Sequence, residues 1–75
     1  MNFEIEFEQE EDGRWIAEIP EIPGVLAYGL TPLQAAANAK ALALRVLAER
    51  METEVSIPSI NSIAFVNHYE PVAVN

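Results

Sequence analysis

Apolar and acidic residues alternate strictly at the start of the chain, from Asn2 to Glu8. A period of two is typical of a strand that buries one face and exposes the other. One face would carry Phe3, Ile5 and Phe7, and the opposite face would carry Glu4, Glu6 and Glu8. We therefore expect a half-buried strand whose aromatic side faces a core and whose acidic side faces away from it.

Three further segments have the composition of strands and are separated by turn-forming residues. They run from Arg14 to Ile19, from Val25 to Tyr28 and from Ile63 to Tyr69. Gly13 and the Pro23-Gly24 pair are typical turn residues, and they would join the first three strands into an antiparallel meander.

A helix is predicted from Thr31 to Met51, because this stretch has strong helix formers and no glycine or proline after Pro32. Thr31 and Gln34 have the spacing of a capping box, and proline suits the first helical position. The helical period places Ala36, Ala43 and Leu47 on the buried side, flanked by Leu33, Leu44 and Met51 on one side and by Ala39 and Val46 on the other. Lys40 also points towards this side, and we expect its stem to pack while its ammonium reaches solvent.

These elements predict a single α+β domain over residues 1–75, with the order β-β-β-α-β. The helix would cover one face of the sheet and return the chain, so the fourth strand would run parallel to the first and beside it. The expected strand order is 3-2-1-4.

The composition and charge of the chain limit the classes of partner and function that we expect. The chain has 75 residues, no cysteine and a formal charge of −8, from 12 acidic against 4 basic residues. Such an acidic domain is not expected to bind nucleic acid, but it suits a basic partner. The amino terminus lacks the pattern of a signal peptide and nothing is long enough to span a membrane, so the cytoplasm is the expected compartment. Because 51% of the residues are hydrophobic, more than so small a domain easily buries, we expect self-association.

Candidate chemistry is sparse, and we expect no catalytic residue, no cofactor site and no metal site. His68 is the single histidine, and no motif supplies it with a nucleophile or an acid. Glu4, Glu6 and Glu8 lie in line along a strand, which spreads them too far to enclose one ion. Trp15 is expected in the core rather than at an interface.

A set of residues between Gly13 and Arg50 nevertheless forms a recognisable pattern. It comprises Asp12-Gly13-Arg14-Trp15, Ala17, Pro20, Pro23-Gly24, Gly29, Thr31 and Ala35-Ala36. This combination resembles the HicB-type antitoxins, which show a Gly-aromatic-x-Ala strand, a Pro-x-x-Pro-Gly turn, Gly-x-Thr and an alanine-rich helix. Gln34 departs from the pattern, because the family usually has an acidic residue there.

The resemblance implies a partial ribonuclease-H-like fold without catalytic activity. It also implies a partner, a small basic HicA-like toxin that cleaves mRNA and is blocked when its active surface is covered. Fuller members carry a C-terminal DNA-binding module, but only six residues follow Tyr69, so direct DNA binding is not expected.

Two functions from different classes therefore remain open. A third hypothesis, a metal-dependent nuclease, is disfavoured because the acidic residues of the first strand lie in line and do not converge on one point. The first is an antitoxin-like protein that binds its toxin through Glu4, Glu6 and Glu8, although this row would also serve as an ordinary solvated face. The alternative is an orphan oligomeric scaffold or small-ligand-binding domain of the same fold. In either case we expect a homodimer or tetramer, formed through apolar residues on the uncovered sheet face, namely Ile16, Ala64 and Val66.

Overall fold

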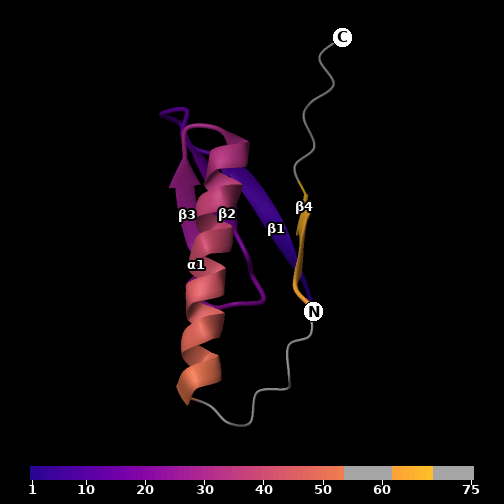
Figure 1. Cartoon of the computed structure of the whole chain (residues 1–75). Coiled ribbons are helices and arrows are strands. Elements are labelled where there is room, and N and C mark those ends of the chain that lie inside the picture. The colour runs from indigo at the N-terminus through magenta and orange to yellow at the C-terminus, as the bar shows by residue number, and fades with distance from the viewer. Residues whose placement is uncertain (54–61, 69–75) are drawn as a thin grey trace.

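The computed structural model describes residues 1–53 and 62–68, which form one helix packed on a four-stranded mixed sheet (Figure 1). The strands are β1 (Asn2–Gln9), β2 (Trp15–Glu18), β3 (Leu26–Gly29) and β4 (Ala64–Asn67), and the helix is α1 (Pro32–Thr53). The sheet order is β3-β2-β1-β4, with β1 antiparallel to β2 and parallel to β4. The expected α+β class, strand order and strand directions are confirmed.

Hydrogen-bonded turns determine where β2 and β3 begin. β2 is shorter than the sequence pattern predicts, and β3 has the predicted length but is shifted by one residue. The amide of Glu10 donates to the carbonyl of Arg14 at 2.7 Å, so β2 starts only at Trp15. Val25 is held by two turn hydrogen bonds, with Ile19 and Ile22, so β3 starts at Leu26. In the described part of β4 only Ala64–Asn67 is strand, and Tyr69 lies outside the described residues.

The cap of α1 forms nearly as predicted. The hydroxyl of Thr31 accepts a hydrogen bond from the amide of Gln34 at 3.1 Å. The side chain of Gln34 reaches back to the amide of Leu30 at 3.1 Å, one residue before the position that a standard capping box uses. The helix then continues to Thr53, two residues beyond the predicted end, and the Thr53 hydroxyl donates to the Glu49 carbonyl.

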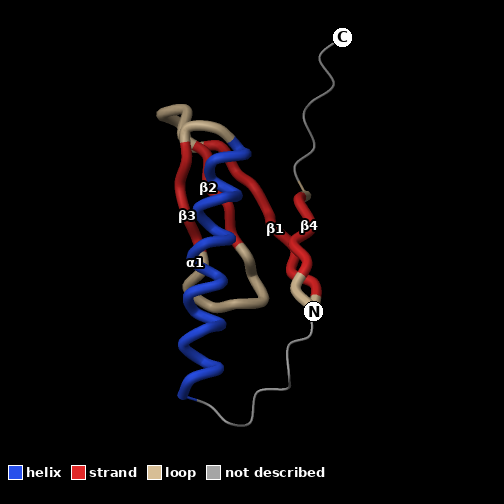
Figure 2. The backbone as a smooth tube through the Cα atoms, viewed as in Figure 1, coloured by secondary structure: helices blue, strands red, loops and turns tan. Residues whose placement is uncertain are grey.

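The core lies between α1 and the inner face of the sheet. Its largest fully buried side chains are Ile5, Ile19, Ile22 and Val25. The helix contributes mainly small residues to it, namely Ala35, Ala36, Ala39 and Ala43, with Leu47. Because alanines allow a close approach, α1 lies directly over β2 and β3 (Figure 2). β4 lies beyond β1, where Lys40 Nζ of α1 is 5.9 Å from the centroid of the Phe65 ring.

One prediction about the helix is wrong. Leu33, Leu44 and Met51 were expected to flank the buried side, but they are 77%, 47% and 56% exposed. The predicted centre of the buried face is correct, since Ala36, Ala43 and Leu47 are buried, but this face extends towards Ala35 and Ala39 and not towards the three exposed residues. Trp15, expected in the core, is half-buried and packs against its edge.

Candidate functional site

The outer face of the sheet, opposite α1, carries the predicted acidic row. Phe3 and Ile5 are buried beneath the helix side, so Glu4, Glu6 and Glu8 point the other way and are exposed. The three glutamates project from one strand, as the alternation predicts. This places every predicted partner-binding residue on one open surface.

Strand register adds a fourth carboxylate to this surface, which alternation within β1 alone does not reveal. Glu18 on β2 stands directly opposite Glu6 on β1, and Ile16 stands opposite Glu8. Directly opposed residues of an antiparallel pair have Cβ atoms about 5 Å apart. Glu18 therefore belongs to the same surface, and we call Glu4, Glu6, Glu8 and Glu18 the acidic row.

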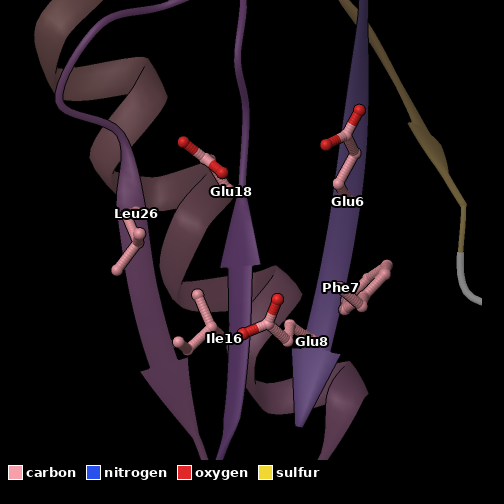
Figure 3. Close-up of a pocket in the computed structure, with 6 residues that line it drawn as sticks. All are labelled: Glu6, Phe7, Glu8, Ile16, Glu18 and Leu26. Carbon is pink, nitrogen blue, oxygen red and sulfur yellow. The ribbon is translucent and has the colours of Figure 1, made fainter. Parts of the chain in front are cut away.

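A shallow hollow of about 170 Å³ lies among these side chains. Figure 3 shows Glu6 and Glu8 projecting from β1, Ile16 and Glu18 from β2 and Leu26 from β3, with α1 behind the sheet. Its lining residues are Glu6, Phe7, Glu8, Ile16, Glu18 and Leu26. Carboxylates thus surround an apolar floor made by Ile16 and Leu26, which fits a group with an apolar stem and a cationic head.

Apolar residues border the acidic row on both sides. Leu26 and Tyr28 on β3 are 41% and 43% exposed, and Val66 on β4 is 44% exposed. The predicted interface residues Ile16, Ala64 and Val66 do lie on this face, because the register pairs them with Glu8, Asn2 and Glu4 respectively. The outer face is therefore a mixed surface rather than an apolar patch.

Three contacts involve charged groups at the two ends of this face. His68 Nε2 lies 2.9 Å from Glu4 Oε1, and both side chains are about half exposed. At the other end, the Arg14 guanidinium lies 4.6 Å from the centroid of the Tyr28 ring and Arg14 Nε is 2.7 Å from Asp12 Oδ2. The backbone and side-chain hydrogen bonds from Arg14 lower the pKa of Asp12 below its usual range. None of the three contacts was predicted, because each depends on strand pairing or turn geometry.

Within residues 1–53 and 62–68, no group of three or more His, Cys, Asp or Glu side chains is arranged to hold a metal ion. In the same residues, no helix combines the length and the apolar character that a membrane crossing requires. No protein-family model, curated protein or solved structure matches the chain.

Proposed function

We propose that the protein is a non-catalytic binding domain that neutralises a small basic partner by covering it with the acidic row. The observation that carries the proposal is the register of β1 and β2, which adds Glu18 to Glu4, Glu6 and Glu8 on one exposed sheet face. A row of carboxylates spaced along strands suits a broad cationic protein surface better than a single ion.

Repulsion within the acidic row is expected to destabilise the free protein, and this supports a binding role. Glu6 and Glu18 face each other directly, and like charges in that position destabilise a sheet. Residues that oppose folding in this way are expected where function requires them. A basic partner would relieve the repulsion on binding, and the hollow beside Ile16 and Leu26 would accept the stem of a lysine or arginine.

The nature of the partner follows from the resemblance to HicB-type antitoxins. On that basis the partner is a small basic HicA-like ribonuclease toxin, and the fold is a partial ribonuclease-H-like one. The expected location is the cytoplasm, where such a toxin meets mRNA, and the protein is expected to self-associate. The second candidate is an orphan oligomeric scaffold, which the exposed apolar residues of α1 favour.

The test uses the product of a short basic open reading frame with a prominent histidine beside the gene. Its expression should arrest growth, and co-expression of this protein should restore it. We expect the variant with Glu4→Gln, Glu6→Gln and Glu8→Gln to associate with that product about tenfold more slowly at low salt, with a flatter salt dependence.

A matched control separates the surface from total charge. The changes Glu11→Gln, Glu49→Gln and Glu52→Gln also remove three charges, but they lie in a turn and at the end of α1. This control should associate nearly as fast as the unchanged protein. If both triple variants slow equally, the acidic row is not the docking surface, and if the gene has no basic neighbour, the scaffold function replaces the antitoxin.

A further inference from the structure

The side of α1 that faces away from the sheet carries a continuous apolar stripe. Leu33, Leu44 and Met51 are exposed there, with the exposed alanines 37, 41 and 48 between them. At 100° per residue, the stripe lies roughly 125° around the helix from the centre of its buried face. It extends about 27 Å along the helix at 1.5 Å per residue.

Charge on the molecule is divided between two sides. The chain carries Glu4, Glu6, Glu8, Glu10, Glu11, Asp12, Glu18 and Glu21 before the helix, on the sheet and its turns. In contrast, α1 carries three cations, Lys40, Arg45 and Arg50, against two acids, Glu49 and Glu52. Two copies that met through the outer sheet face would bring two acidic rows together, whereas two copies that met through α1 would keep them apart.

The order of residues along the stripe is complementary to itself in the reverse direction. In an antiparallel pair centred near Leu42, Leu33 lies level with the second copy's Met51, and Ala37 lies level with its Ala48. Leu44 then lies level with Ala41, so a large side chain meets a small one. An interface about a two-fold axis requires this kind of self-complementary surface.

The charges at the helix ends also suit an antiparallel pair. The first turn of α1 contains no acidic residue, although an N-terminus favours negative charge. Glu52 of one copy would lie level with the first turn of the other and would supply that charge. Antiparallel packing therefore aligns both the apolar stripe and the helix dipoles favourably.

We propose that a second copy of this chain docks on the apolar stripe of α1, forming an antiparallel helix pair with both acidic rows facing outward. The inference does not depend on the function proposed above. A single helix pair covers less than the roughly 800 Å² per partner of a standard interface. The dimer should therefore dissociate in the micromolar range.

The test compares a leucine-to-lysine substitution on α1 with the same substitution on the outer face of the sheet. Leu44→Lys lies in the stripe and Leu26→Lys lies on the outer sheet face, where the two leucines are 47% and 41% exposed. Both variants lose one unit of negative charge, so general repulsion between copies falls equally. By sedimentation equilibrium from 5 to 200 µM (about the range expected for a small interface), the unchanged protein and Leu26→Lys should reach dimer mass. Leu44→Lys should stay at the monomer mass of 8.3 kDa.

A second measurement covers the case in which Leu44→Lys disturbs folding. The chain has no cysteine, so Leu44→Cys and Arg45→Cys each introduce a single thiol on α1. A short bismaleimide should link Leu44→Cys into dimers and should leave Arg45→Cys, which lies about 100° further around the helix, mostly unlinked. A monomeric unchanged protein at 200 µM, or a dimer lost in Leu26→Lys and kept in Leu44→Lys, would overturn the proposal.

Discussion

At the scale of single residues, the acidic row places side chains of like charge next to each other. Glu18 stands opposite Glu6, and Glu8 projects from the same strand two residues further along. Directly opposed side chains of like charge destabilise a strand pair, whereas side chains of opposite charge stabilise it by about 0.2–1 kcal/mol relative to a pair of alanines. We therefore expect the repulsion between Glu6 and Glu18 to lower the free energy of unfolding of the free protein.

The change Glu18→Gln should stabilise the free protein. It keeps the size and shape of the side chain and removes one of the two opposed charges. We expect the free energy of unfolding to rise by about 0.5 kcal/mol, or the melting temperature by roughly 2–4 °C. Thermal unfolding by circular dichroism at low salt measures this.

Glu11→Gln is the control for Glu18→Gln, because it removes one charge from an exposed turn position without a cross-strand partner in the β1–β2 register. Its melting temperature should change by less than that of Glu18→Gln. A lower melting temperature for Glu18→Gln would mean that the carboxylate makes a favourable contact in the free protein, which contradicts the proposed strain.

At the scale of elements, the join between β3 and α1 depends on a glycine. A Cβ atom placed on Gly29 would lie 2.8 Å from the Cα of Ala35 and 2.9 Å from the carbonyl carbon of Gln34. Both are backbone atoms of the first helical turns, so they move only if α1 shifts on the sheet. Gly29 is needed for a close approach of backbone segments and not for its torsion angle.

The change Gly29→Ala should destabilise the protein strongly. Forcing atoms into a well-packed contact costs about 1–3 kcal/mol, and here the contact is with backbone. Chemical denaturation measures the loss. Gly13 provides the contrast, because its φ is +94° and an added Cβ would meet nothing within 4 Å.

Asparagine distinguishes the two glycines, since it adopts positive φ more readily than alanine does. Gly13→Asn should retain most of the stability, while Gly29→Asn should be at least as damaging as Gly29→Ala. Equal effects of asparagine at both positions would show that space at Gly29 is not the constraint.

The same elements show what a sequence can predict about this fold. The alternation in β1, the helix cap and the turn residues were enough for the strand order β3-β2-β1-β4. The rotation of α1 was predicted only in part. Ala36, Ala43 and Leu47 are buried as expected, but apolar residues surround much of the helix, and the leucine-bearing flank was wrongly expected to be buried. The narrow gap at Gly29 and Ala35 decides for alanine, and that gap exists only once the sheet and helix are packed.

The candidate site was also predicted only in part. Glu4, Glu6 and Glu8 follow from alternation within one strand, which is local information. Glu18 joins them through the register of the β1–β2 hairpin, and His68 reaches Glu4 through the parallel pairing of β4. Register depends on turn geometry and on distant pairing, so neither contact was visible in the pattern of a single strand.

At the scale of the whole molecule, the acids gather on the sheet side while α1 carries more cations than acids. Eight of the twelve acidic residues therefore lie on the sheet and its turns, where they repel one another. Repulsion of this kind destabilises a compact state and is screened by salt, whose Debye length falls from about 30 Å at 0.01 M to about 3 Å at 1 M.

Salt should accordingly stabilise the free protein. Between low salt and about 0.5 M NaCl we expect a rise in melting temperature of roughly 4–8 °C, equivalent to about 1 kcal/mol in a domain of this size. The measurement belongs near 5 µM, below the range of roughly 10–200 µM in which the helix pair should form, because association would itself raise the melting temperature.

Two triple variants locate the source of this salt response. The variant with Glu4→Gln, Glu6→Gln and Glu8→Gln should lose most of it, because it removes three of the four carboxylates of the acidic row. The variant with Glu11→Gln, Glu49→Gln and Glu52→Gln has the same net charge and keeps the acidic row, so it should retain most of the response. Identical responses would mean that total charge, and not its concentration on one sheet face, governs the stability of the molecule.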